Sequence, residues 1–292
     1  MEHLIGLKST EYEHPADKAA LEKLRNSTVF KPLVTEFIHQ GVERIYRIQY
    51  TGSSLKIKKE DYPDIYRALE NAGAALGITG KKLPDLYLQY YYAINAFTTG
   101  KKEPLIVIYS GTIDLLDDDE LQYVIGHELG HILSDHVLYH MMVHGLVDFI
   151  NLPAKDLIEL PLYYWSRMSE LTADRAGLLA CQDLNVAIRT MIKMAGLPQS
   201  QYDKINVQAF IDQARDFNEK NTGFLDETFK FIAIANSYHP WLVLRAAELL
   251  KWVESGEYDR IISEYRAVEC TNCGGMIPAK SQLCPICGGK HN

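Results

Sequence analysis

Two histidines and a glutamate near the middle of the chain have the types and spacing of a hydrolytic metal site. His127, Glu128 and His131 form the pattern His-Glu-x-x-His within an apolar stretch. On a helix, side chains four residues apart lie on one face, so both imidazoles can bind one zinc ion. Glu128 can then take a proton from a water bound to that metal. The alternative is a buried helix with two core histidines.

A third protein ligand is expected on another helix, because hydrolytic zinc sites hold three protein ligands and keep one position open. Glu170 and Asp174 lie four residues apart in the segment Ser169–Arg175, which is expected to be helical. Glu170 can bind the metal, and Asp174 can accept a hydrogen bond from a ligand histidine and fix its orientation. Without the upstream motif, this pair would be expected on an ordinary solvated face.

Four of the five cysteines predict a second metal site near the C-terminus. Cys270 and Cys273 form one C-x-x-C pair, and Cys284 and Cys287 form another after a spacer of ten residues. Four thiolates fill a tetrahedral zinc site, so this ion would be structural. Iron is the alternative, because the same geometry can hold it. We therefore expect two zinc ions, one catalytic and one structural.

The composition indicates a globular chain and argues against a nucleic-acid binder. The 292 residues are 47% hydrophobic and 23% charged, with a net charge of −8. Nucleic-acid binding would need a basic stripe, which this charge does not supply. No basic start with an apolar run marks a secretory signal. Charged residues and prolines interrupt the most apolar stretch, residues 137–165. We therefore expect a cytoplasmic chain without a transmembrane span.

Hydrophobic patterns predict a mainly helical chain with a few strands. Helices are expected at residues 15–25, 61–76 and most of 121–253, with a loop at 218–226. The acidic run Asp117–Glu120 should begin one helix, because carboxylates are favourable there. Strands around Gly and Ser turns are expected at the following segments: 42–50 and 55–59 as a β-hairpin, 86–97, and 105–111.

Three further segments complete a family pattern. They are Asn95–Gly100, Ser110–Leu116, and His239-Pro240 followed by Arg245. Together with His-Glu-x-x-His and Glu170, they resemble the gluzincin endopeptidases of metallopeptidase family 48, which include HtpX and the CAAX prenyl proteases. The resemblance runs from about Asp64 to Arg245. It implies an α+β, mainly helical, gluzincin-type zinc metallopeptidase domain with a small sheet, to which the cysteines add a small C-terminal zinc ribbon.

The resemblance also implies roles for residues around the metal. The backbone of Asn95 and Ala96 would bind an extended substrate, because an exposed strand edge offers free N–H and C=O groups. His239 would stabilise the oxyanion of the tetrahedral intermediate, and Arg245 would pair with an active-site carboxylate. The alternatives are a turn residue for Asn95 and a helix-start histidine for His239.

We therefore predict a zinc metalloendopeptidase that hydrolyses peptide bonds through a metal-bound water, with Glu128 as general base. Residues 1–60 would form an N-terminal extension of helices and a β-hairpin, 61–266 the metallopeptidase domain, and 267–292 the zinc ribbon. The partners would be peptide or protein substrates, a protein that contacts the ribbon and, peripherally, a membrane. The alternatives are a zinc-stabilised adaptor and a latent peptidase whose own terminal segment covers the cleft.

Overall fold

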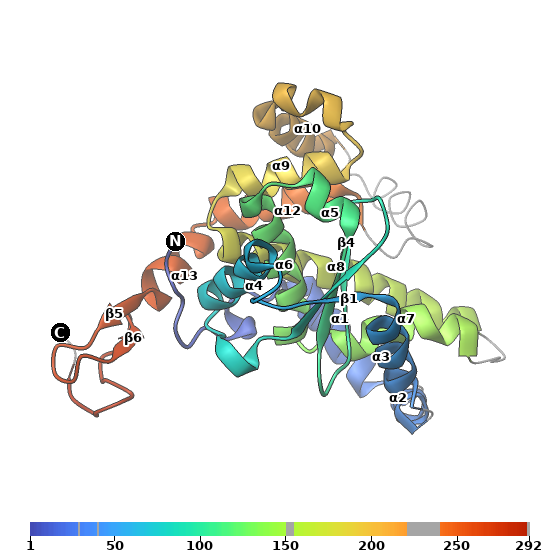
Figure 1. Cartoon of the computed structure of the whole chain (residues 1–292), viewed down its shortest axis with the longest axis horizontal. Coiled ribbons are helices and arrows are strands. Elements are labelled where there is room, and N and C mark those ends of the chain that lie inside the picture. Colours follow the sequence, from blue (N-terminus) through green and yellow to red (C-terminus); the bar gives the residue numbers. More distant parts are fainter. Residues whose placement is uncertain (29, 40, 150–154, 221–239, 291–292) are drawn as a thin grey trace.

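The computed structural model describes residues 1–28, 30–39, 41–149, 155–220 and 240–290 of the chain. In this part, helices surround one small sheet, and a small C-terminal unit projects to one side (Figure 1). The α-helices are α1 (Pro15–Asn26), α2 (Phe30–His39), α3 (Val42–Ser53), α4 (Pro63–Ala75), α5 (Ser110–Leu115), α6 (Asp118–Leu133), α7 (Val137–Phe149), α8 (Lys155–Cys181), α9 (Leu184–Met194), α10 (Val207–Lys220), α12 (Leu242–Glu254) and α13 (Glu257–Tyr265). Short 3-10 helices lie at Ser9–Glu11, Gly80–Lys82 and Gln199–Lys204. The fold is α+β and mainly helical, as predicted.

Four strands of the described chain form the main sheet, in the order β1-β2-β4-β3. They are β1 (Leu55–Ile57), β2 (Asp85–Gln89), β3 (Ala96–Thr99) and β4 (Leu105–Tyr109). β2 and β4 are parallel, whereas β1 and β3 pair antiparallel with their neighbours. Ile106 and Ile108 of β4 pack into the core that contains α4 and α6, and Val107 packs with Tyr50 of α3 on the other face. The sheet therefore has helices on both faces and leaves β3 at one edge.

The hairpin predicted near the N-terminus is wrong. Residues Val42–Ser53, which include its expected first strand, form helix α3, and β1 pairs instead with β2. Val42, Tyr46 and Tyr50 recur every four residues and pack against the protein. The apolar residues of this segment thus follow the periodicity of a helix and not that of a strand.

The single strand predicted for residues 86–97 is also wrong, because the chain leaves the sheet between β2 and β3. The Tyr91 carbonyl instead accepts hydrogen bonds from the Gly111 N–H at 3.0 Å and the Ser110 hydroxyl at 3.2 Å. Tyr90 and Tyr92 are 90% and 63% exposed. Aromatic residues favour strands, but these side chains have no sheet surface on which to pack.

The loop predicted for residues 218–226 is wrong for its first three residues. Asn218–Lys220 belong to α10, and this stretch contains no Gly or Pro to interrupt a helix. Residues 221–226 lie outside the described part of the chain.

Helix α6 begins where the acidic run predicted its start. The Asp117 side chain accepts a hydrogen bond from the Glu120 N–H at 2.9 Å, and the Glu120 side chain accepts one from the Asp117 N–H at 3.0 Å. This capping box satisfies N–H groups that the helix leaves unpaired. Glu120 is buried and pairs with Arg189 and Lys193 of α9, so the start of α6 is fixed against α9.

Small residues let α6 and α8 approach each other very closely. A Cβ atom added at Gly126 would lie 2.2 Å from the Ala180 Cβ, and one added at Gly130 would lie 2.6 Å from the Ala176 Cβ. Such distances are too short for carbon atoms, so only glycine fits at these two positions. The contact places α8 directly beside the helix that carries His127 and His131.

The C-terminal unit is attached firmly to the rest of the chain. It contains β5 (Ala267–Glu269) paired antiparallel with β6 (Met276–Pro278), and β5 follows α13 directly. The Ala267 N–H donates a hydrogen bond to the His3 carbonyl at 2.8 Å, and the Ile5 N–H donates one to the Tyr265 carbonyl at 2.9 Å. The N-terminal segment therefore binds α13 and β5 together.

Residues 1–60 are not separate from the helices that follow them. Leu4 and Ile57 are buried in the same hydrophobic core as side chains of α4, α6 and α8. The division into residues 1–60, 61–266 and 267–292 stays a prediction.

We expect Gly126→Ala to lower the free energy of unfolding by about 1–3 kcal/mol, the usual cost of overpacking. The added methyl group would push α8 away from α6. Gly52→Ala is the matched control, because Gly52 also lies in a helix but an added Cβ there meets nothing within 4 Å. Urea unfolding followed by circular dichroism measures both variants. Equal stability of the two would contradict the tight helix contact.

Candidate metal and catalytic site

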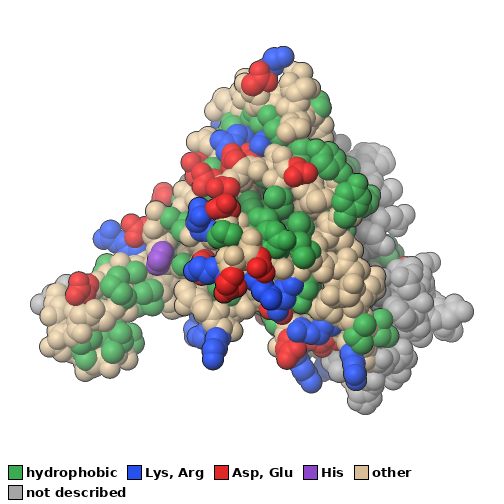
Figure 2. Space-filling view, in the orientation of Figure 1, with side chains coloured by type: hydrophobic (Ala, Val, Ile, Leu, Met, Phe, Trp, Pro, Cys, Tyr) green, Lys and Arg blue, Asp and Glu red, His purple; other side chains and the backbone are tan. Residues whose placement is uncertain are grey.

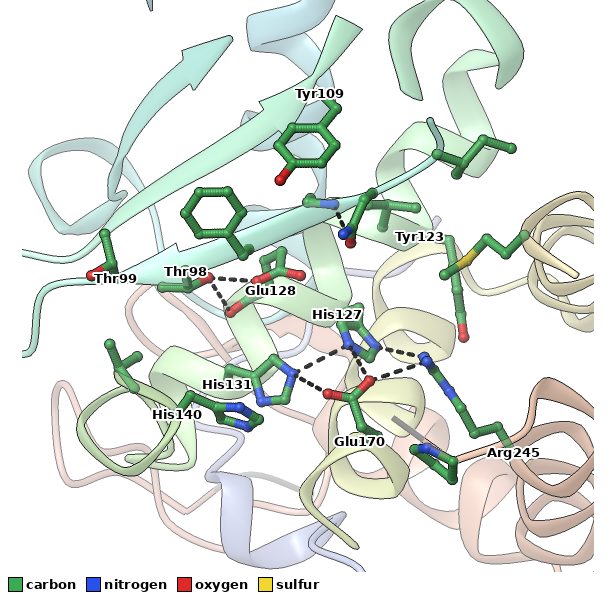
Figure 3. A pocket seen from close by; sticks show the side chains of 18 of the residues that line it. Thr98, Thr99, Tyr109, Tyr123, His127, Glu128, His131, His140, Glu170 and Arg245 are labelled. Carbon is green, nitrogen blue, oxygen red and sulfur yellow. Dashed lines mark hydrogen bonds and ion pairs between the residues drawn. The ribbon is translucent and has the colours of Figure 1, made fainter. Parts of the chain in front are cut away.

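Three side chains from α6 and α8 meet in one cleft (Figure 3). The Nε2 atoms of His127 and His131 are 3.2 Å apart, and each lies 3.5 Å from a carboxylate oxygen of Glu170. All three residues are more than nine-tenths buried, with exposed fractions of 8%, 5% and 2%. The structure thus brings together the three residues that the sequence predicted as ligands.

This arrangement fits a zinc ion. In a tetrahedral site with nitrogen and oxygen ligands, neighbouring ligand atoms lie about 3.4 Å apart. The two Nε2 atoms are 3.2 Å apart, and the Glu170 Oε2 and Oε1 lie 3.5 Å from the Nε2 of His127 and of His131, respectively. Two imidazoles and one carboxylate are also a donor set used by hydrolytic zinc sites that keep one position open. The assignment of these residues as ligands stays a prediction.

Asp174 lies one turn from Glu170 and beside His127. Its Oδ1 is 3.1 Å from the His127 Nδ1 and accepts a hydrogen bond from the Tyr123 hydroxyl at 2.9 Å. Burial acts to raise the pKa of Asp174, but Arg245 and His127 outweigh burial and lower this pKa to about 2. An ionised Asp174 can accept the Nδ1–H of His127, which leaves the Nε2 lone pair for a metal.

Arg245 of α12 balances the buried negative charge. Its guanidinium lies 2.8 Å from the Asp174 Oδ2 and 3.1 Å from the Glu170 Oε2, and only 4% of Arg245 is exposed. Burial opposes its charge, but the two carboxylates raise the pKa of Arg245 above its ordinary value. The expected pairing of Arg245 with an active-site carboxylate is present.

Glu128 faces the same cleft but is not one of the three clustered side chains. The Thr98 hydroxyl of β3 donates a hydrogen bond to the Glu128 Oε2 at 2.7 Å, and Figure 3 shows this bond at the strand side of the site. The edge strand therefore fixes the orientation of the carboxylate. No local sequence pattern indicates this contact, because Thr98 and Glu128 are 30 residues apart in the chain.

The cleft has a volume of about 670 Å³ and runs along the edge of the sheet. Helices α3, α6, α7, α8 and α12 contribute to its lining together with β3. Aromatic rings form one part of its wall, where Phe97 lies 4.8 Å from Tyr50 and 6.0 Å from Tyr109 between ring centroids. The side chains of His127, His131 and Glu170 thus lie in a cleft that has both polar and apolar walls.

The backbone groups of β3 differ in what they can bind. The Asn95 carbonyl accepts a hydrogen bond from the Tyr109 N–H at 3.1 Å, and the Asn95 N–H donates one to the Thr112 hydroxyl at 2.8 Å. Both groups of Asn95 are therefore already paired inside the protein. Backbone groups alternate in direction along a strand, so those of Ala96 and Thr98 point away from β4. The Asn95 side-chain oxygen accepts a hydrogen bond from the Ala96 N–H at 2.9 Å.

His239, the predicted oxyanion donor, lies outside the described residues. The next two residues, Pro240 and Trp241, line the cleft. The role of His239 stays a prediction.

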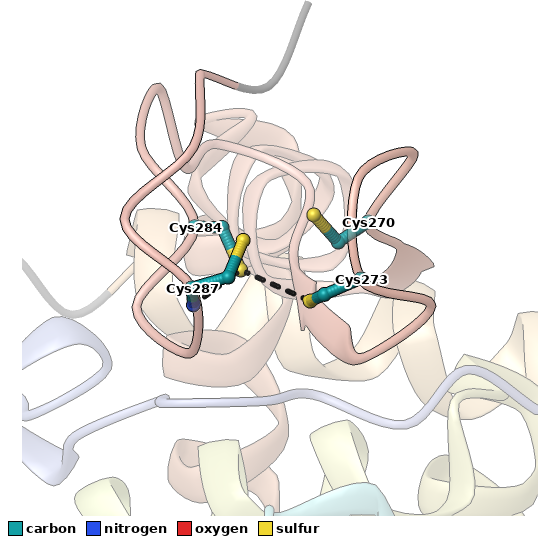
Figure 4. A group of neighbouring side chains, drawn as sticks. All are labelled: Cys270, Cys273, Cys284 and Cys287. Atoms are coloured by element: carbon teal, nitrogen blue, oxygen red, sulfur yellow. Dashed lines mark hydrogen bonds between the residues drawn. The ribbon is translucent and has the colours of Figure 1, made fainter.

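The four C-terminal cysteines form a second cluster (Figure 4). Their sulfur atoms all lie within 4.8 Å of one another; the residues are Cys270, Cys273, Cys284 and Cys287. The Cys273 and Cys284 sulfurs are 3.7 Å apart. Thiolates around one zinc ion lie about 3.8 Å apart. The Gly289 N–H and the Asn272 side chain lower the pKa of Cys287 to about 6, which favours the thiolate that a metal binds.

The comparisons with known proteins agree with this geometry. The family model "Peptidase family M48" matches residues 60–158 and 149–253. The chain belongs to peptidase family M48. It is accordingly a protease, and its family implies a metal, typically zinc. Among the described residues, no helix is long and apolar enough to cross a membrane.

Relatives in this family differ in how much of the chain they cover. The plastoglobule-localized metallopeptidase 48 of Arabidopsis thaliana is 32% identical over 265 residues, which are 88% of this chain and 76% of that protein. A protease HtpX homolog of Tropheryma whipplei is 34% identical over 99 residues, 33% of each chain. One from Dictyoglomus thermophilum is 30% identical over 148 residues, 49% of this chain and 48% of the relative. The chain thus spans a third to a half of these HtpX homologs, and no solved structure matches it.

We expect Arg245→Met to destabilise the zinc-free protein by about 3–5 kcal/mol, because it leaves two buried carboxylates without their cation. Arg189→Met is the control. Arg189 pairs with the buried Glu120, but Lys193 pairs with the same carboxylate and would remain. Chemical unfolding in the presence of a chelator measures both losses. A loss no larger than that of the control would show that Arg245 does not stabilise the protein through these charges.

Proposed function

We propose that this member of family M48 is a zinc-dependent endopeptidase in which Glu128 transfers the proton during hydrolysis. The observation that carries the proposal is the position of Glu128, which lies in the cleft with His127, His131 and Glu170 but is held by Thr98. A carboxylate in this position can accept and return a proton without giving up a metal contact.

Each residue of the site has a separate role in the proposed reaction. Zinc bound by His127, His131 and Glu170 would polarise the scissile carbonyl and lower the pKa of water. Glu128 takes a proton from the attacking water and passes it to the leaving amine as the peptide bond breaks. The Thr98 hydroxyl directs the Glu128 carboxylate. His239 is the proposed donor to the oxyanion.

The substrate is proposed to bind as an extended peptide along β3. Among the described strands, β3 pairs only with β4, and Ala96 and Thr98 point their backbone groups away from it. A peptide that adds to this edge would form main-chain hydrogen bonds with these groups. At Ala96, a C=O group of the peptide would accept the hydrogen bond that the Asn95 side chain accepts from the Ala96 N–H in this structure. This proposal transfers the predicted binding role from the backbone of Asn95 to that of Thr98 and keeps it for Ala96.

The small C-terminal unit is proposed to be a zinc ribbon that contacts a protein partner. Hydrophobic side chains gather on its surface (Figure 2), where Met276, Leu283 and Ile286 are 50%, 59% and 64% exposed. None of the described residues that line the cleft belongs to this unit.

The cellular location, in the cytoplasm with peripheral membrane contact, also stays a prediction. The Arabidopsis relative, whose name places that protein at plastoglobules in the chloroplast, supports the peripheral membrane contact and not the cytoplasmic location. Cell fractionation tests both parts of this prediction.

Glu128→Gln should keep the fold and the zinc of the wild type but lose peptide hydrolysis, because the amide cannot accept the proton. Asp119→Asn is the control, since Asp119 lies on the same helix but is exposed. Metal analysis and cleavage of a proteome-derived peptide library test both variants. The metal analysis should find two zinc ions in each protein.

Each proposal has its own contrary result in this experiment. Hydrolysis at the wild-type rate by Glu128→Gln would contradict the proposed role of Glu128. A zinc-loaded wild type that cleaves no peptide would favour the adaptor, unless removal of a terminal segment releases activity. In that case the latent peptidase is correct.

Replacement of Cys273 and Cys287 by serine should release the structural metal and leave turnover of a short fluorogenic peptide unchanged. The physical reason is that the four-cysteine site is closed and lies away from the cleft. Cys181→Ser, outside the cysteine cluster, is the matched control and should retain both metals. Complete loss of turnover in a folded double variant that keeps its other zinc ion would show that the ribbon takes part in catalysis.

A further inference from the structure

His131 is bonded to a buried series of polar side chains that reaches helix α1. The His131 Nδ1 lies 3.1 Å from the His136 Nδ1, and the His136 Nε2 lies 3.0 Å from the Asp17 Oδ2. His136 and Asp17 are both fully buried. Neither residue lines the cleft, so neither is placed to touch a substrate.

The chemistry of the three groups fixes which nitrogens carry hydrogen. If the His131 Nε2 binds a metal, the neutral imidazole carries its hydrogen on Nδ1. This N–H must then donate to the His136 Nδ1, which acts as an acceptor. His136 in turn carries its hydrogen on Nε2, which lies 3.0 Å from the Asp17 Oδ2, within ion-pair distance although the two groups are not aligned as a hydrogen bond. This arrangement leaves the His131 lone pair directed toward the metal.

Asp17 is itself held by two further donors. Its Oδ1 accepts a hydrogen bond from the Trp165 Nε1–H at 3.0 Å, and its Oδ2 accepts one from the Thr172 hydroxyl at 2.6 Å. Burial acts to raise the pKa of Asp17, but the interactions with His136 and Thr172 outweigh burial and keep this pKa below its ordinary value. The carboxylate is therefore a fixed, charged acceptor for His136.

The two metal-binding histidines of α6 thus differ in how a carboxylate reaches them. Asp174 contacts His127 directly, whereas Asp17 reaches His131 through a second imidazole. Outer carboxylates of this kind orient a ligand histidine and make it more basic. Asp17 lies in α1, outside the residues 60–158 and 149–253 that match the family model, so no part of that match accounts for it.

We propose that Asp17 is a positioning residue of the metal site, which acts through His136 to orient His131. The proposal rests on the proposed function, because it takes His131 as a zinc ligand. It makes α1 a part of the metal site.

Another arrangement would make His131, His136 and His140 ligands of a separate ion, because one nitrogen of each lies within 4.8 Å of the others. His131 would then have to serve two ions, and the His136 Nε2 would still face Asp17. His140 Nε2 also lies 2.8 Å from the Ser169 hydroxyl, which itself donates to the Ser166 carbonyl. The contacts of His136 with His131 and Asp17, and of His140 with Ser169, account for these nitrogens without a further ion.

Cobalt(II) titration of the full chain tests the proposal. Thiolate ligands give charge-transfer absorption that a His-His-Glu set lacks, so the two metal sites can be followed separately. We expect Asp17→Asn and His136→Phe to lower cobalt affinity at the His-Glu site by about 10–100-fold and to leave the cysteine site unchanged. His136→Gln should recover part of the loss, because an amide can also accept and donate.

Glu120→Gln is the matched control, since Glu120 is a fully buried, ion-paired carboxylate that does not contact the metal cluster. Circular dichroism confirms that each variant is folded at the temperature of the titration. Wild-type cobalt affinity in folded Asp17→Asn, an equal loss in Glu120→Gln, or a third ion per wild-type chain would each overturn the proposal. Failure of the wild type to bind cobalt outside the cysteine site would instead contradict the proposed function.

Discussion

The close contact between α6 and α8 is the constraint on which the rest of the site depends. Gly126 and Gly130 face Ala180 and Ala176, and no larger pair of side chains would fit between these helices. Because the two backbones lie so near each other, the short side chain of Glu170 reaches both imidazoles of α6. A wider separation would move the carboxylate out of range of a shared metal. The geometry of a three-ligand cluster is therefore set by residues that carry no functional group.

The same contact buries charge that the protein must then balance. Glu170 and Asp174 are almost inaccessible to water. An unpaired carboxylate in such buried surroundings would cost much free energy. Arg245 contacts both, and the imidazole of His127 lies between them. Glu128, in contrast, is held by a neutral hydroxyl group. The structure thus separates the carboxylates that are neutralised from Glu128, the one proposed to transfer a proton.

Most of the candidate site could be predicted because its parts are local in sequence. His127 and His131, Glu170 and Asp174, and the two C-x-x-C pairs each depend on spacings that one helix or one turn fixes. Tyr123 could have been found by the same rule, since it precedes His127 by one helical turn. Thr98 and Asp17 could not, because their partners lie far away in the sequence. Neither residue has a neighbouring pattern that indicates its contact.

The errors in the fold have a similar cause. The segment Val42–Ser53 mixes aromatic and β-branched residues with charges, so its local propensity favours a strand. The packing of Tyr46 and Tyr50 against distant parts of the chain stabilises a helix instead. Between β2 and β3, aromatic residues favour continuation of the strand, but the chain must pass around the end of β4 to reach the edge of the sheet. Tertiary contacts override local preference in both cases.

The pairing of His3 and Ile5 with residues near 266 has a consequence for synthesis. A chain that emerges from the ribosome folds its N-terminal parts first where their contacts are local. Here the hydrogen bonds of His3 and Ile5 can form only after α13 and β5 have been made, and Asp174 can meet Arg245 only after α12 has been made. Contacts of such long range slow folding. The described lining of the cleft is therefore complete only after Arg245 has been made, so a shorter nascent chain lacks the cation that balances Glu170 and Asp174.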